Sequence, residues 1–295
     1  MKELARRGHN VILFGKKGSD VKNYGIELQE FSGSFEEFER VIPSDTDIVH
    51  LSYASTLKRD IPLLVNIHGN GQIGENFPLN TVFVSKKHAE NHGSDCYVHN
   101  ALDLEEYPFF PKEWKLQDLL FLAKASWRVK NLKDSIWIAK RSEKTLHIAG
   151  GRAWFPSRFV RSYGAVGGEE KKKILEKTDA LLFPVRWHEP FGIAIIEAMA
   201  SGNPVFGSCY GSLPEIIGQD VGIVAKSKEE LLAYISEDRV FSRRKIRNYV
   251  ETHFNIKSYT DKYLDLYARV IKGEKLNPVR PTWKLKTPPQ ELLSF

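Results

Sequence analysis

The sequence predicts an α/β protein built from two Rossmann-like, doubly wound parallel-sheet domains that face a cleft. Three observations support this prediction. Short β-rich runs alternate with helical patterns along the whole chain. Most of the runs are continuously apolar, as expected for strands buried on both faces of a parallel sheet. The length of 295 residues fits about two domains of ordinary size.

The expected elements follow in chain order. Strands are expected over 10–15, 48–53, 63–68, 81–85, 119–125, 145–150, 180–185, 204–209 and 221–225. Helices are expected over 35–41, 168–178, 192–201, 228–236, 239–253 and 258–272. A capping box predicts the start of two of them, from Ser34 with Glu37 and from Ser227 with Glu230.

Composition predicts where the domains divide. Pro108, Pro111 and a change of charge near residue 112 indicate a first domain over 1–112 and a second over 113–276. The first carries 12 basic and 16 acidic residues, and the remainder of the chain carries 31 and 21. Residues 277–295 hold four prolines and are expected to form an extended tail. The basic second half is the more favourable host for an anion, with a solvated basic face as the alternative.

Other classes of protein are disfavoured. Charged residues make up 27% of the chain and hydrophobic residues 42%, which is typical of a globular protein. No zinc-finger, RRM-type or basic-zipper pattern predicts binding to nucleic acid. No apolar run reaches the ~18 residues of a membrane span, and no signal peptide is recognisable. The two cysteines, Cys96 and Cys209, favour a reduced, cytoplasmic setting.

The most informative segment runs from Ala180 to Ile217. An apolar strand leads into the loop EPFG, and a helix follows in which Glu197 occupies the second turn. Gly192 allows a ligand to approach the backbone closely, and the amides of Phe191 and Gly192 open a helix N-terminus. Glu189 on the loop and Glu197 in the helix can therefore face one pocket.

This segment resembles glycosyltransferase family four, whose members are retaining enzymes with the GT-B fold. The family's Glu-x7-Glu motif is matched by EPFGIAIIE, followed by AMASGNPV and GSLPEII. Further similarity lies in HNALDLEEY, LHIAGG, GAVGGEEKKKILEKTDALLFPV and VGIVAKSKEELLAYI, and extends over most of the chain.

The resemblance implies a site for a nucleotide-diphosphate sugar. Glu197 is expected to bind the ribose of the donor, and Glu189 the hydroxyls of its sugar beside the amides of Phe191 and Gly192. The alternative is that both acids only stabilise a helix start. The matched segments also carry the remaining residues expected in the donor site, Gly150, Val166 and Ile193.

The donor diphosphate requires cations, which the family supplies after the first strand of the second domain. The corresponding segment here is FLAKASWRVKNL. Lys124 lies where the family has arginine, and Lys130 resembles its later lysine. Arg128 is able to substitute for either. A solvated basic turn is the alternative.

In the first domain, LLVNIHGNG places His68 at the end of a buried strand. Its position resembles that of a family histidine near the transferred sugar. His50, with Asn70, is expected on the acceptor side. For either histidine a purely structural role is the alternative.

The resemblance implies front-face transfer, in which the leaving phosphate accepts the acceptor's proton. Neither a metal nor another cofactor is then required. Asp45-Thr46-Asp47 and the spacing of His88, His92 and Cys96 are expected to be a turn and a structural set, not metal sites. The acceptor is expected to be a glycan, a lipid or a small molecule. Peripheral membrane contact would suit the basic helix near Arg243–Arg247, for which ordinary solvation is the alternative.

One departure from the family lies at the start of the sequence. LARRGHNVILF resembles the segment that follows the family's first helix, so the first domain is expected to lack its usual first strand and glycine-rich loop. A catalytically weak protein that binds nucleotide or glycan is therefore an alternative to a glycosyltransferase. A sugar epimerase with the same fold is a further one.

Overall fold

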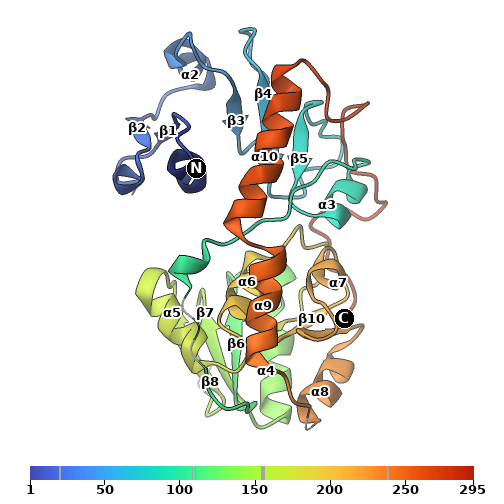
Figure 1. Ribbon diagram of the computed structural model, residues 1–295. Coiled ribbons are helices and arrows are strands. Elements are labelled where there is room, and N and C mark those ends of the chain that lie inside the picture. Colours follow the sequence, from blue (N-terminus) through green and yellow to red (C-terminus); the bar gives the residue numbers. More distant parts are fainter. Residues whose placement is uncertain (20, 108, 110, 154–156, 238) are drawn as a thin grey trace.

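The computed structural model describes residues 1–19, 21–107, 109, 111–153, 157–237 and 239–295. Figure 1 shows two sheet-containing domains stacked end to end, with one long C-terminal helix, in orange-red, that rises from the junction along the first domain. Pro108, part of the predicted domain boundary, lies outside the described residues.

The second domain contains a six-stranded parallel sheet, ordered β8-β7-β6-β9-β10-β11. Counted from β6 the order is 3-2-1-4-5-6, that of a dinucleotide-binding Rossmann sheet. The strands are β6 (Asp118–Leu122), β7 (Thr145–Ala149), β8 (Val160–Gly164), β9 (Ala180–Phe183), β10 (Val205–Ser208) and β11 (Gly222–Ala225). The four residues of β9 and of β10 are all buried, which explains their apolar sequences.

Helices connect these strands and complete the main hydrophobic core. Helix α4 contacts α8 and α6 contacts α9, while the same core joins them to the sheet. The helices are α4 (Leu132–Arg141), α5 (Gly168–Lys177), α6 (Ile193–Ala200), α7 (Leu213–Ile216), α8 (Lys228–Ser236) and α9 (Arg243–His253). A 3-10 turn, η3 (Arg128–Lys130), precedes α4.

The first domain carries two separate parallel sheets. One pairs β1 (Ile12–Gly15) with β2 (Glu27–Glu30), and the other has the order β3-β4-β5. The second of these contains β3 (Val49–Leu51), β4 (Leu63–Ile67) and β5 (Thr81–Phe83). The domain's remaining elements are α1 (Lys2–Arg6), η1 (Lys22–Tyr24), α2 (Phe35–Val41), α3 (Lys86–Asn91) and η2 (Leu104–Glu106).

Two C-terminal segments cross between the domains. Helix α10 (Ile256–Ile271) packs Tyr263 and Leu266 against Leu64 and Val82 of the three-stranded sheet. The stretch predicted as second domain, 113–276, therefore ends in a helix that packs on the first. The tail then returns to the second domain, where the amide of Leu293 donates to the carbonyl of Arg186.

The predicted fold class is confirmed, and several details differ from the predictions. The edge strands β2 and β8 and the helix α4 were not among the expected elements. At α2 the capping box forms as predicted, with Ser34 and Glu37 bonded in both directions. At α8 only half of it forms, because the Glu230 carboxylate accepts from the amide of Lys226 instead.

Candidate functional site: the switch point of the second sheet

The candidate site lies where the strand order of the second sheet reverses. Strands β6 and β9 are neighbours there, and ligands bind parallel sheets outside the carboxyl ends of the strands at such a point. The loops after these two strands meet. The amide of Arg186 donates to the carbonyl of Val129 at 2.7 Å, and Asn131 donates to the carbonyl of Pro184 at 2.9 Å.

A buried ion pair joins the two loops. Lys130 Nζ lies 2.6 Å from Glu189 Oε2, and both side chains are nearly enclosed. The indole N–H of Trp187 donates to the same oxygen at 2.6 Å. The lysine ammonium also lies over the Trp187 and Phe183 rings, 4.9 and 5.3 Å from their centroids. Aromatic faces and a carboxylate thus fix this cation in place.

The backbone around Glu189 is held from both domains. Asn70 donates its side-chain amide to the carbonyl of His188, and the Ser85 hydroxyl donates to that of Pro190. From the second domain, the amide of Ser212 donates to the carbonyl of Glu189 at 2.9 Å. The loop therefore forms part of the domain interface, and its position depends on both domains.

Glu197 makes a second set of contacts. Its Oε1 accepts from the Tyr107 hydroxyl and from Lys171 Nζ, each at 2.6 Å. Burial and the neighbouring Glu197 carboxylate raise the pKa of Tyr107, so the phenol remains a hydrogen-bond donor. Among the described residues, no hydrogen-bonding partner is present for the other carboxylate oxygen, Oε2.

The N-terminus of α6 lies between these two acids. Gly192 adopts φ +82°, and a side chain there would clash with Ile195 at 2.8 Å. Phe191 is buried, whereas Ile193, also predicted in the donor site, is 47% exposed. The peptide amides at this helix start are suited to an anion or a hydroxyl group.

The other two predicted cations lie on the loop after β6, which also carries Lys130. Lys124 and Arg128 are exposed, and Lys124 Nζ lies 5.2 Å from the centre of the Trp127 ring. Gly150 supports this loop, because a Cβ there would lie 2.2 Å from the carbonyl oxygen of Ala123. Val166 lies half-buried between β8 and α5.

His68 lies exposed just after β4, and desolvation lowers the pKa of its ring. Asn70, two residues further, is buried against the second domain. These two residues are the predicted first-domain positions that lie in the segment contacting the Glu189 loop.

His50 has different neighbours. It stacks on Tyr263 and lies 2.7 Å from the Tyr267 hydroxyl, so the structure places it against α10. The residue is exposed overall, although its ring packs against these two tyrosines. Desolvation, aided by the α-amino group and His68, lowers the pKa of His50 to about 4.

The two segments expected to be a turn and a structural set have contacts of those kinds. Asp45–Asp47 form part of a turn before β3, closed by the amide of Thr46 on the carbonyl of Pro43. His88 contacts the carbonyl of Gly69, and His92 contacts those of His88 and Asn70. In the part of the chain that the structure describes, no three acidic, histidine or cysteine side chains group as metal ligands.

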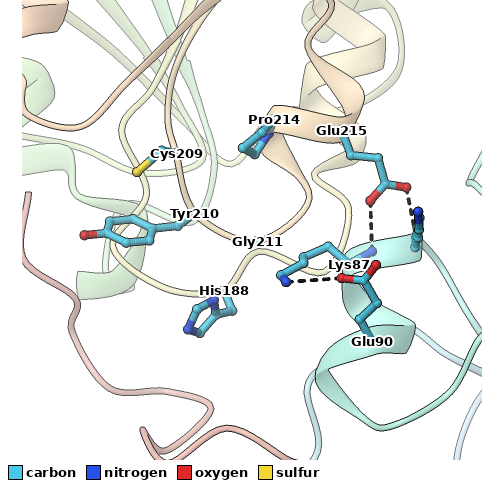
Figure 2. A pocket seen from close by; sticks show the side chains of 9 residues that line it. Lys87, Glu90, His188, Cys209, Tyr210, Gly211, Pro214 and Glu215 are labelled. Carbon is cyan, nitrogen blue, oxygen red and sulfur yellow. Dashed lines mark hydrogen bonds and ion pairs between the residues drawn. The ribbon is translucent and has the colours of Figure 1, made fainter.

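A cavity of about 520 Å³ lies at the domain junction, and His188, next to Glu189 in the chain, is among the residues that line it (Figure 2). The first domain contributes the start of α3, and the second contributes His188 and the Tyr210–Gly211 turn. In Figure 2, Glu215 reaches across the junction to α3. Its carboxylate accepts from the amides of Lys86 and Lys87 at 2.8 and 2.9 Å.

Helix α9, the basic helix considered for membrane contact, offers fewer free arginines to a membrane surface than expected. Arg243 and Arg247 are buried, and donate to the backbone carbonyls of Ser201 and Ala200 respectively. Of the helices described, none has both the length and the apolar character needed to cross a membrane.

Sequence reasoning missed three residues that contact the two acids. Trp187 lies only two positions before Glu189, so its closeness in the sequence could have indicated the contact. Tyr107 and Lys171 lie 90 and 26 positions from Glu197, so only the folded chain brings them together.

Comparison with known proteins identifies a glycosyltransferase pattern in the second domain. The family model described as glycosyl transferases group 1 matches residues 156–252. An uncharacterized glycosyltransferase of Methanocaldococcus jannaschii is 40% identical over 88 residues, covering 30% of this chain and 22% of the relative. A phosphatidyl-myo-inositol mannosyltransferase of Propionibacterium freudenreichii is 30% identical over 89 residues, covering 27% and 23%. The aligned segments thus span less than a quarter of either relative.

Solved structures are similar over nearly the whole chain. AviGT4, a glycosyltransferase involved in avilamycin A biosynthesis, has a TM-score of 0.77 at 23% identity, covering 95% of this chain and 88% of that one. Anabaena HepE, solved with UDP and glucose, has a TM-score of 0.68 at 16% identity, covering 90% and 93%. Together with the parallel sheets, these similarities show that the fold is of the GT-B type.

Proposed function

We propose that this protein is a glycosyltransferase that moves a sugar from a nucleoside diphosphate to an acceptor hydroxyl. The observation that carries the proposal is the placement of Glu189, Lys130 and Glu197 around one helix N-terminus at the switch point of the second sheet. This arrangement falls within and beside the region that matches the group 1 family.

Each part of such a donor finds a suitable partner. The unpartnered Oε2 of Glu197 is available to a ribose hydroxyl, and the exposed Lys124 and Arg128 to the diphosphate. The α6 amides and Glu189 are suited to the sugar. His68 would lie near the transferred sugar, and Asn70, which binds the Glu189 loop, would border the acceptor side from the first domain.

The proposed reaction retains the configuration of the sugar and needs no metal. The bond between the anomeric carbon and the phosphate oxygen breaks, while the acceptor oxygen bonds to the same face of that carbon. The leaving phosphate takes the acceptor's proton. Lys124, Lys130 and the α6 amides would stabilise the charge that develops on the phosphate.

We also propose a class of acceptor and a cellular setting for this protein. The acceptor would be a glycan, a lipid or a small molecule, and no nucleic acid is proposed as a partner. The free thiols Cys96 and Cys209 suit a reducing, cytoplasmic setting. A protein that binds the nucleotide sugar without transferring it is the second candidate, and the split first-domain sheets favour it.

The first experiment is thermal unfolding with UDP, GDP, ADP and their common sugar conjugates, with and without Mg²⁺. A ligand at a hundred times its Kd stabilises by ~2.7 kcal/mol, which is a shift of several degrees at this size. We expect one nucleotide to raise the Tm without Mg²⁺, and Glu197→Gln to abolish the rise. Glu229→Gln, on the exposed face of α8, is the control.

Turnover then separates the two candidate functions. Release of the nucleoside diphosphate that depends on an added acceptor, with a glycosylated product, supports transfer. Binding without release over the acceptors tested supports the second candidate. No Tm rise with any nucleotide contradicts both.

A further inference from the structure

We propose that Trp187 is a positioning residue for the donor sugar, acting through Glu189. This inference rests on the proposed function, since it specifies how that site would present its carboxylate. Trp187 is distinct from the acids and cations assigned above, because it would not itself touch the reacting atoms.

The geometry assigns the two oxygens of Glu189 different tasks. Oε2 already accepts from the Trp187 indole and from Lys130, both at 2.6 Å. Within the described residues, Oε1 has no hydrogen-bonding partner. Because two donors hold one oxygen, the plane of the carboxylate is fixed and the other oxygen stays available for a ligand hydroxyl.

Trp187 also fixes the position of the cation. Its ring lies 4.9 Å from Lys130 Nζ, so that a single indole contacts both members of the ion pair. Removing only the N–H group would leave Lys130 on an aromatic face but free the carboxylate to rotate. Lys130 would then draw either oxygen toward itself, including the one that we assign to the sugar.

Trp187 is itself well placed to hold a fixed geometry. It is 9% exposed, and its ring packs edge to face with the ring of Trp127, with 6.3 Å between the centroids. The amide of Glu189 donates to the carbonyl of Trp187 at 2.9 Å, which closes the turn between the two residues. Side-chain and backbone contacts therefore connect the indole to the carboxylate.

The test compares Trp187→Phe with wild type, using Trp137→Phe as a matched control. Trp137 on α4 also contacts cations, Arg141 and Lys228, but lies outside the site. Binding of the nucleoside diphosphate and of its sugar conjugate is measured by calorimetry, and kcat and KM by nucleotide release.

We expect Trp187→Phe to lower kcat by about tenfold to a hundredfold, the scale of a hydrogen bond to a charged group amplified in an enclosed site. The Kd for the nucleoside diphosphate should change less than about threefold, because we assign the bound diphosphate to Lys124 and Arg128, and a phenyl ring would still offer Lys130 an aromatic face. In the Glu189→Gln background the same substitution should cost almost nothing, because its effect passes through the carboxylate.

Three results would overturn the inference alone. One is wild-type kcat in Trp187→Phe, and another is an undiminished loss when Glu189→Gln is already present. The third is an equal loss of nucleotide and sugar-nucleotide binding, which would show a purely structural role. If wild type binds no nucleoside diphosphate or sugar conjugate, the proposed function fails and this inference fails with it.

Discussion

Gly211 holds the backbone of the Glu189 loop at a distance that no other residue allows. It has φ +63°, and a Cβ there would lie 2.3 Å from both the amide nitrogen and the carbonyl oxygen of Glu189. Gly211→Ala should therefore displace the loop. We expect a loss of about 3 kcal/mol or more in the free energy of unfolding, together with weaker binding of the sugar conjugate.

Gly273 provides the control for this substitution. It has φ +83°, but a Cβ there would meet nothing within 4 Å. Gly273→Ala should cost only the conformational penalty of about 1–2 kcal/mol. Thermal unfolding of both variants measures the difference, and equal Tm values would contradict the steric argument.

The sequence allowed the two central acids and Lys130 to be proposed, but not the other side chains that contact the acids. Glu189 and Glu197 belong to one continuous motif and Lys130 to a basic loop, and the resemblance of these segments to a known family singled the three residues out. Tyr107 follows η2 and Lys171 lies on α5, so each reaches Glu197 only in the folded chain. The tertiary arrangement also turned His50 toward α10, because β3 presents alternate residues to opposite faces.

Helices α7 and α3 are joined across the domain junction by one carboxylate. Glu215 lies on α7, accepts from two amides at the start of α3, and also pairs with His99. Burial alone would raise the pKa of Glu215. The hydrogen bonds from His99 and the two amides together lower the pKa by more than burial raises it, so it falls below its usual value. The carboxylate is therefore stabilised in its charged form.

Glu215→Gln should lower the free energy of unfolding by about 1–3 kcal/mol, the usual cost of losing hydrogen bonds to a charged group. Glu90→Gln on α3, whose pair with Lys87 is exposed, should cost about 0–1 kcal/mol. Because the pKa of Glu215 is depressed in the fold, its contribution is present above the unfolded pKa of 4.5 and is lost as the pH falls further. Chemical unfolding at pH 7 and at about pH 3 tests this, and a difference between wild type and Glu215→Gln that does not shrink between the two would contradict it.

At the scale of elements, apolar runs and caps carried most of the prediction. Helices α2 and α8 begin and end where predicted, because their capping serines mark the start. The edge strands β2 and β8 have the polar sequences ELQE and VRSYG, and each pairs on one side only. A search for buried runs does not find such strands. Helix α4 follows Asn131 at φ 60°, within a segment interpreted only as a phosphate loop.

At the scale of the whole molecule, the order of elements does not determine which domain a C-terminal helix joins. The sequence predicts a helix over 258–272, which α10 matches closely, but its buried Tyr263 packs on a surface formed by β3, β4 and β5. The tail crosses the junction again, with Trp283 packed between His92 and His188. These crossings connect the two domains through segments beyond the predicted boundary near residue 112.

Both domains contain histidines whose pKa is lowered by the fold, so the stability of the whole protein should fall in mild acid. Desolvation is the main cause for each of the six histidines concerned. They are His50, His68, His88, His92, His147 and His188. In each case the unfolded chain, with a pKa near 6.5, binds a proton more readily than the fold does, so stability is complete above that value and declines as the pH falls below it. A fully buried ring such as His88 adds up to about 1.4 kcal/mol per pH unit to the loss of unfolding free energy, within the pH range below 6.5 where only the unfolded chain is protonated.

We expect the Tm to fall between pH 7 and pH 5, before most carboxylates titrate. His50→Phe should reduce the slope down to about pH 4, the pKa of that ring in the fold. A Tm that is constant between pH 7 and pH 5 would mean that these rings accept protons within the folded structure, and would contradict their desolvation.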